Sequence, residues 1–141
     1  KHYIIRTSWV IGDGRNFVNI MQDLAARGVR PSVVNDQIGR LTFTDTLARG
    51  IKHLLEIGAP YGTYNLTNEG QPVSWADIAK IVFEKSGKSP SDVQPVSTAE
   101  YFADKPNTAK RPLQSTLDLT KIEKTGFIPE DWRYKLDKLL G

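Results

Sequence analysis

The sequence has no cysteine, one methionine and only two histidines among its 141 residues. Without cysteine the chain forms no disulfide bond and no thiolate metal site. The two histidines, His2 and His53, lie far apart in the sequence, so a zinc site is not expected. Long apolar runs are also missing, since none approaches the roughly 20 residues that a transmembrane helix needs. The chain starts at Lys1 without a recognisable signal peptide, and we expect a cytoplasmic protein or a part of one.

A strong excess of one charge is absent as well. The net charge is +3, the sequence pI is about 9.2, and the basic residues are scattered instead of clustering with aromatic residues. We therefore expect no nucleic-acid partner, whereas a mildly positive field suits a small ligand that carries phosphates. The content of 39% hydrophobic and 25% charged residues is typical of a globular protein with a core.

The first part of the sequence alternates apolar runs with helix signals. Residues 3–7 are short, apolar and partly β-branched, which predicts a buried parallel strand. Asn16 is a good cap for a helix that ends before Gly28, and residues 31–34 predict the next strand. This strand–helix–strand order predicts that the two strands pair in parallel.

A second helix is predicted after a loop at residues 37–41. Thr44 or Asp45 is expected to cap this helix, and Gly58 to close it. The apolar residues that we expect on its inward face are Leu47, Ile51, Leu54 and Leu55.

A capping box formed by Ser74 and Asp77 predicts a third helix, which ends at Gly87. The other predicted elements are strands at 62–66 and at Val96, a helical turn at 98–101, a loop at 104–112, a helix or turn at 117–126 and a final helix at 129–140. No repeat or clear linker interrupts the pattern, so we expect one α/β unit over residues 1–141.

Trp9 follows the first predicted strand, at the edge of an α/β sheet where ligands usually bind. Its indole can stack on a sugar or a ring, or it can be a core tryptophan. The hydroxyls of Thr7 and Ser8 can reach a ligand or make turn hydrogen bonds. Asn16 is either a plain cap or part of a phosphate seat at the start of the helix.

Two loops carry further candidates. Gln37, Gly39 and Arg40 can together hold a polar ligand, and Arg111 can pair with a phosphate or with a nearby carboxylate. A catalytic set is not found, because G-x-S-x-G and H-E-x-x-H motifs are missing. Gly12 and Gly14 do not complete a dinucleotide-binding G-x-G-x-x-G.

Four stretches occur in an order that resembles one family. They are R-T-S-W-V-I-G, N-F-V-x-x-M, S-V-V-N-D-Q-I-G-R-L-T and K-R-P-L-Q-S-T-L-D. They are similar to the carboxyl-terminal part of the dTDP-4-dehydrorhamnose reductases, which are extended short-chain dehydrogenases/reductases. The resemblance implies the carboxyl-terminal portion of an NAD(P)-binding Rossmann-like fold, with short parallel strands and flanking helices.

The resemblance also implies roles for particular residues. Trp9 is expected to lie against the sugar, and Arg111 to pair with the diphosphate. Thr7 and Ser8 match the strand end near the nicotinamide. The remaining expected substrate-binding residues are Asn16, Phe17, Met21, Gln37, Gly39 and Arg40. No catalytic residue is expected in this chain, because the amino-terminal dinucleotide-binding half with its Tyr-x-x-x-Lys is expected upstream of Lys1.

The implied reaction is the reduction of the 4-keto group of a dTDP-linked 6-deoxysugar with NADPH or NADH, which yields dTDP-L-rhamnose for polysaccharide biosynthesis. The implied partners are the dTDP-sugar and the amino-terminal half, with no membrane partner. The resemblance does not decide whether the protein forms a homodimer or uses Mg²⁺.

Two residues depart from the family pattern. Ile11 stands where the family usually has tyrosine, and Leu41 where it usually has proline. Both departures leave the sugar open, so a reductase or epimerase for a related dTDP- or UDP-sugar is an alternative. A binding-only module for nucleotide sugars is another, and a structural role through an exposed apolar face is a third.

Overall fold

A computed structural model describes residues 1–141 of the protein. Contacts within the chain divide it into two compact units. The first unit comprises Lys1–Gly12, Arg40–Gln71 and Thr116–Leu139. The second unit comprises Asp13–Gly39, Pro72–Ser115 and Leu140–Gly141. The sequence predicts one unit, whereas these contacts form two groups. Short parallel strands with flanking helices confirm the predicted α/β class.

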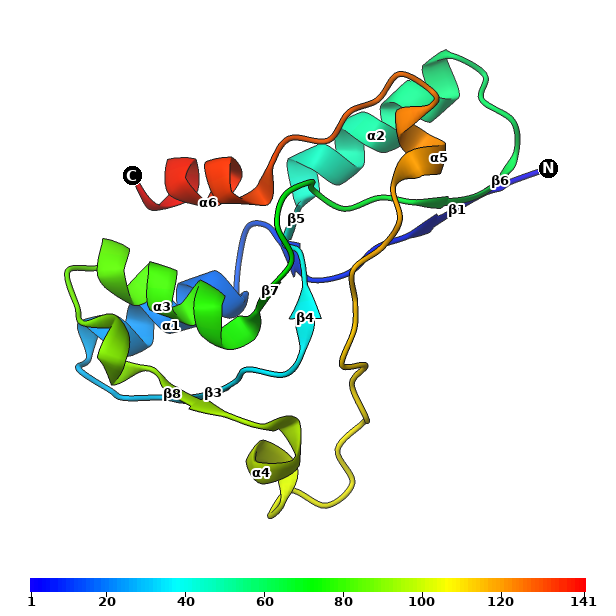
Figure 1. Cartoon of the computed structure of the whole chain (residues 1–141). Helices are drawn as coiled ribbons and strands as arrows, with labels where there is room; N and C mark the ends of the chain where they lie inside the picture. Colours follow the sequence, from blue (N-terminus) through cyan, green and yellow to red (C-terminus); the bar gives the residue numbers. More distant parts are fainter. The chain divides into compact units, whose positions relative to one another are not determined.

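The first unit contains two pairs of parallel strands (Figure 1). Strand β1 (Tyr3–Arg6) pairs with β6 (Gly62–Asn65), and β2 (Val10–Ile11) pairs with β5 (Thr42–Phe43). Its helices are α2 (Thr44–Glu56), α5 (Thr120–Glu123) and α6 (Trp132–Leu140). None of the helices in either unit is long and apolar enough to cross a membrane.

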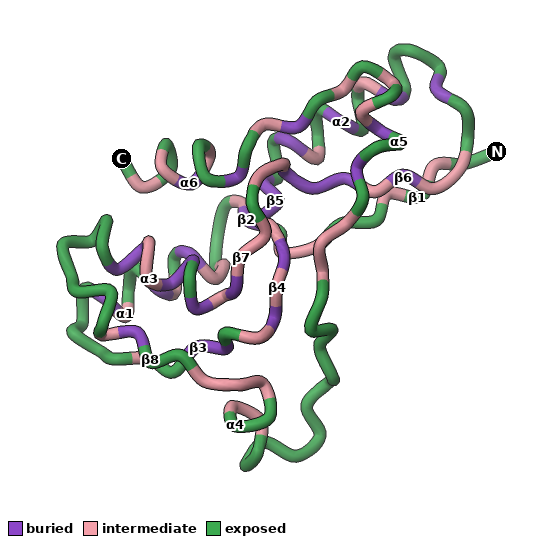
Figure 2. Tube along the Cα trace, viewed as in Figure 1, coloured by how far each residue is buried: buried purple, intermediate pink, exposed green.

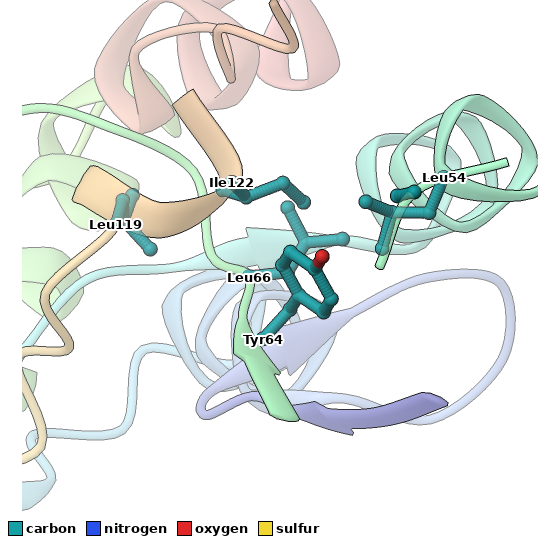
Figure 3. Close-up of a cluster of buried hydrophobic side chains, with 6 residues drawn as sticks. Leu54, Tyr64, Leu66, Leu119 and Ile122 are labelled. Carbon is teal, nitrogen blue, oxygen red and sulfur yellow. The ribbon is translucent and has the colours of Figure 1, made fainter. Parts of the chain in front are cut away.

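The core of the first unit lies where α2, β6 and α5 meet (Figures 2 and 3). It is made of Leu54, Ala59, Tyr64, Leu66, Leu119 and Ile122. The side chains of β1 alternate, so that Tyr3 and Ile5 pack against this cluster while Ile4 is exposed. One face of β1 is therefore covered by the core and the other face is open.

Helix α2 buries only part of the face that its apolar pattern predicts: Leu54 is buried and Leu47 packs against the core. Ile51 and Leu55, expected to face inward, are exposed, and the buried residues are Thr46, Gly50 and Leu54. The reason is the close approach of α2 to Leu66: a Cβ atom on Gly50 would lie 2.5 Å from Leu66 Cδ2. The predicted N-cap, Thr44 or Asp45, was also wrong, because the N-cap residue is Phe43 and makes no side-chain capping bond.

The second unit is built around two helices, α1 (Phe17–Ala26) and α3 (Trp75–Lys85), which pack against each other (Figure 1). Parallel strands β3 (Ser32–Val34) and β8 (Gln94–Val96) lie beside them, and β4 (Ile38–Gly39) pairs antiparallel with β7 (Val73–Ser74). The unit is completed by the short 3₁₀ helix η1 (Pro90–Asp92) and by α4 (Thr98–Phe102). The predicted caps of α1 and α3 are confirmed.

Two predictions about strands were wrong. The strands at 3–7 and 31–34 do not pair, since β1 pairs with β6 and β3 pairs with β8. A strand–helix–strand unit needs its helix to cover the sheet that both strands share, but α1 packs on α3 instead. The predicted loop at 37–41 contains strand β4, because its main chain finds a partner in β7.

Candidate functional site

The turn after β1 is held by one buried threonine of the first unit. Trp9 has a φ of +51°, in the left-handed region that a bulky residue rarely adopts. Thr42 donates two hydrogen bonds to the turn, from its amide to the Trp9 carbonyl (3.0 Å) and from Oγ1 to the Ser8 carbonyl (2.6 Å). Trp9 is half-buried and Thr7 is exposed. The tryptophan is thus neither a core residue nor fully free in solvent.

In the second unit, the start of α1 is organised by Asn16. Its side chain accepts a hydrogen bond from the Asn19 amide (3.1 Å) and donates to the Gly14 carbonyl (3.2 Å). The Phe17 ring packs on Trp75 with 4.4 Å between ring centroids, whereas Met21 is buried in the helix packing. Asn16 is therefore a cap, and its predicted contact with substrate, like that of Phe17 and Met21, stays a prediction.

Gln37 is almost fully buried in a short hydrogen-bond network of the second unit. Its amide nitrogen donates to Thr98 Oγ1 (3.1 Å), and this hydroxyl donates to Asp36 Oδ1 (2.6 Å). The hydroxyl and the backbone N–H of Thr98 both stabilise the carboxylate, which lowers the pKa of Asp36. The nitrogen of Gln37 is thus engaged inside the protein and is not offered to a ligand.

The main chain brings the loop that contains Gln37 and Gly39 beside the loop that contains Arg111. Ile38 donates its amide hydrogen to the Leu113 carbonyl (2.8 Å), and its own carbonyl accepts from the Ser115 amide (2.7 Å). Arg111 is exposed and its guanidinium makes no hydrogen bond or ion pair. The second unit therefore presents a free cation beside strand β4.

Arg40 makes hydrogen bonds within the first unit, and its predicted contact with substrate stays a prediction. It donates to the carbonyls of Gly70 (2.8 Å) and Leu117 (3.4 Å). Nearby, a hydrogen bond between the carboxyls of Glu69 and Glu123 raises the pKa of Glu123, and Arg40 opposes this effect. No group of three or more histidine, aspartate or glutamate side chains lies close enough to hold a metal ion, so a role for Mg²⁺ gains no support.

The glycines near the start of the chain are explained by packing and turn geometry. A Cβ atom on Gly12 would lie 2.5 Å from Thr44 Cγ2, so Gly12 permits a close approach. Gly14 has a φ of +82° in a turn, a conformation that glycine adopts readily. These residues do not form a glycine-rich loop of the dinucleotide-binding type.

Two Tyr-x-x-x-Lys spacings occur within the chain, between Tyr101 and Lys105 and between Tyr134 and Lys138. Helix α4 ends at Phe102, so Tyr101 and Lys105 do not share a helix. Tyr134 and Lys138 share helix α6, where Tyr134 lies exposed on the surface. The ammonium of Lys105 lies 3.4 Å from the centroid of the Tyr101 ring, in a cation–π contact with the ring face. A lysine that tunes a catalytic tyrosine must act at the phenolic oxygen, so Tyr101 and Lys105 are not a catalytic pair.

Comparison with known proteins decides which family these motifs come from. The sequence pattern of the RmlD substrate binding domain matches residues 1–141, the whole chain. The chain belongs to the RmlD substrate binding domain family.

The relatives of this RmlD substrate binding domain are longer proteins. A dTDP-4-dehydrorhamnose reductase from Aggregatibacter actinomycetemcomitans is 38% identical over 99% of this chain and 50% of its own length. The spore coat polysaccharide biosynthesis protein SpsK from Bacillus subtilis is 39% identical over 97% of this chain and 46% of its own length. The chain thus spans about half the length of these relatives.

Solved structures agree with this assignment. The crystal structure of dTDP-4-dehydrorhamnose reductase from Bacillus anthracis, in complex with NADP, matches 98% of this chain and 47% of its own with a TM-score of 0.84 and 35% identity. A Clostridium acetobutylicum ortholog matches 96% of this chain and 46% of its own, with a TM-score of 0.82 and 36% identity. The RmlD substrate binding domain fold of this chain is therefore the fold found in these reductases.

Sequence reasoning missed two residues that organise the loops of this RmlD substrate binding domain. Thr42 holds the Ser8–Trp9 turn, and Thr98 holds Gln37. The available signal for Thr42 is its position as a hydroxyl residue between Leu41 and Phe43, in an apolar run where a buried hydroxyl needs a partner. Thr98 gives no comparable signal, because its partner Gln37 is distant in the sequence.

Proposed function

We propose that this chain is the substrate-binding part of a longer reductase that converts dTDP-4-dehydro-L-rhamnose to dTDP-L-rhamnose with NADPH or NADH. The observation that carries the proposal is the 38% identity over 99% of the chain to a protein named as this reductase. The similar fold of the Bacillus anthracis reductase in complex with NADP supports the nicotinamide cofactor. The absence of a dinucleotide loop fits a division of labour in which the rest of the protein binds most of the cofactor.

The loops of the second unit are suited to the nucleotide end of such a substrate. A diphosphate is bound well by the planar fork of an arginine, and Arg111 is exposed and makes no competing bond. Pairing of Ile38 with Leu113 and Ser115 holds the Arg111 loop next to Gly39, whose backbone lacks a Cβ atom. We propose that Arg111 binds the diphosphate and that the loop of Gln37 and Gly39 faces the nucleotide.

The first unit is suited to the sugar end. Trp9 is only half-buried as a residue, in a turn that Thr42 holds, and a flat apolar ring face is a good surface for a sugar. The hydroxyls of Thr7 and Ser8 follow β1, and we propose that they lie on the cofactor side. Such fixed groups reduce the entropic cost of bringing the ketone to the hydride donor. A bound nicotinamide would supply the hydride, and the proton donor would come from residues outside this chain.

The test is an assay of the full-length protein with dTDP-4-dehydro-L-rhamnose and each nicotinamide in turn. We expect oxidation of NADPH or NADH and formation of dTDP-L-rhamnose, identified by NMR. The contrary results are informative: binding of the dTDP-sugar without turnover indicates a binding-only module, and turnover of only a related dTDP- or UDP-sugar changes the substrate. No binding and no turnover would exclude the proposed function.

Arg111→Ala tests the assignment of the diphosphate within that assay. Loss of a charge-assisted hydrogen bond to phosphate should raise the KM for the dTDP-sugar by about tenfold to a hundredfold, with a smaller effect on kcat. The matched control is Arg27→Ala, which removes another exposed arginine of the second unit, one that pairs with Asp23 on α1. Equal effects of the two substitutions on the KM would show that Arg111 does not bind the diphosphate.

A further inference from the structure

Thr42 holds both peptide groups that flank the Cα atom of Trp9. The orientation of the Ser8 carbonyl depends on the φ angle of Trp9, and the orientation of the Trp9 carbonyl depends on its ψ angle. The Thr42 hydroxyl binds the first carbonyl at 2.6 Å and the Thr42 amide binds the second at 3.0 Å. One residue therefore binds both peptide groups whose orientations define the backbone conformation of Trp9.

This hold is needed because the conformation is unfavourable for tryptophan. Apart from glycines, only Trp9 and Asn107 have a positive φ, and asparagine tolerates that region far better than a bulky aromatic residue. Without the hold, Trp9 would relax to a negative φ and its indole would point in a different direction. A strained residue that its surroundings hold in place is a sign of function.

Thr42 is itself held in place by buried neighbours in the first unit. Thr42 is fully buried, so water does not compete for its hydroxyl. The next residue, Phe43, donates its amide hydrogen to Asn68 Oδ1 (2.8 Å). Asn68 is also fully buried, and its amide nitrogen donates to the Glu130 carbonyl (2.9 Å). Buried hydrogen bonds therefore fix strand β5 next to Thr42, the residue that binds the Ser8–Trp9 turn.

We propose that Thr42 is a positioning residue for the sugar subsite: its hydroxyl keeps Trp9 in the left-handed conformation that presents the indole to the sugar ring. This inference rests on the proposed function, because it assumes that Trp9 contacts the sugar of a dTDP-linked substrate. Thr42 itself touches no substrate and acts only through the Ser8–Trp9 turn.

The experiment compares Thr42→Val with Thr42→Ser in the full-length protein. Valine keeps the amide bond and the shape but loses the hydroxyl, whereas serine keeps the hydroxyl. With 5-fluorotryptophan incorporated, the ¹⁹F resonance of Trp9 is assigned by its loss in Trp9→Phe. We expect Thr42→Val to shift this resonance and to raise the KM for the dTDP-sugar about fivefold to tenfold, while the Kd for dTDP alone is unchanged. Thr42→Ser should restore both properties.

Thr125→Val is the matched control, since Thr125 also donates its hydroxyl to a backbone carbonyl of the first unit, that of Ile122 at the end of α5. It should lower stability and leave the Trp9 resonance and the KM unchanged. If Thr42→Val also lowers only stability, or weakens the binding of dTDP as much as that of the dTDP-sugar, the positioning role is wrong. Wild-type protein that fails to bind the dTDP-sugar would instead overturn the proposed function, so the two failures are distinct.

Discussion

At the scale of single residues, Trp9 combines a left-handed backbone conformation with a bulky side chain that disfavours it. A left-handed conformation costs a residue with a Cβ atom roughly 1–2 kcal/mol, and the structure keeps it through two hydrogen bonds from Thr42. Asn107, the other such residue, carries a side chain that suits this region. Trp9 is therefore the residue whose replacement should reveal stored strain.

Trp9→Gly should be more stable than Trp9→Ala. Both variants lose the indole equally, but glycine accepts the positive φ and alanine does not. The relief of strain exceeds the entropy that glycine gains in the unfolded chain, so we expect a difference of about 0.5–1 kcal/mol in the free energy of unfolding. The measurement is urea-induced unfolding of both variants, and both should also bind the dTDP-sugar more weakly than wild type.

Trp75 gives the control for this comparison. It opens helix α3 without a positive φ, so Trp75→Ala should be more stable than Trp75→Gly, the usual order in a helix. If alanine is also the more stable replacement at Trp9, that turn is not strained.

At the scale of secondary-structure elements, α4 depends on two carboxylates at its first turn. Asp36 accepts bonds from the hydroxyl and amide of Thr98, and Glu100 accepts from the amide and hydroxyl of Ser97. The hydrogen bonds from Thr98 lower the pKa of Asp36, and those from Ser97 lower the pKa of Glu100. Ionised carboxylates accept these bonds more strongly than neutral carboxyls do, so this helix start is most stable when both are ionised.

Acid should loosen α4 before it affects the rest of the second unit. Because both folded-state pKa values lie below the unfolded ones, about 3.9 for aspartate and 4.3 for glutamate, the stabilisation is complete above that range. It is lost as the pH falls through the folded-state pKa values. The amide resonances of Thr98 and Glu100 in an NMR pH titration should report this loss.

Asp36→Asn is the control for the titration, because asparagine keeps an acceptor oxygen but has no acidic proton. In this variant the Thr98 amide should lose its acid transition while Glu100 keeps its own. A Thr98 transition that is unchanged in Asp36→Asn, or one centred above the ordinary carboxyl range, would contradict the assignment.

Sequence reasoning located those elements whose signals are local. Asn16 and the box of Ser74 and Asp77 predicted where α1 and α3 begin, because a capping side chain binds a backbone amide a few residues away. Strand partners were missed because a short apolar strand carries no information on its neighbour. Tyr3 pairs with Gly62, and nothing in residues 3–7 indicates that register.

The same limit applied to the buried face of α2 and to the candidate site. Gly50 is buried because it lets α2 approach Leu66, and a glycine does not count as apolar in a periodic pattern. Trp9 was identified from its place after a strand, but Thr42 was not, since its role exists only once β2 and β5 pair. Arg40 fits a ligand loop by its chemistry, yet its bonds to Gly70 and Leu117 arise from contacts that are distant in sequence.

At the scale of the whole molecule, the open face of β1 is the feature that a longer protein would explain. Strands β1 and β6 form a parallel sheet of two strands, and each keeps one edge without a strand partner. Parallel sheets are normally covered on both faces, but here Ile4 is 47% exposed. The relatives are about twice as long as this chain. We propose that the remainder of the full-length protein covers this face.

These 141 residues, produced alone, should therefore self-associate through β1, with a second copy in place of the missing cover. Ile4→Lys should raise the monomer fraction in sedimentation velocity over a range of concentrations, because a lysine on an open strand disfavours pairing between copies. Stability should change little, since the side chain points away from the core. Ile128→Lys is the control: Ile128 is 67% exposed and belongs to the segment between α5 and α6, which contains no strand. A wild-type chain that stays monomeric, or an equal response to both substitutions, would show that β1 is not the surface that needs covering.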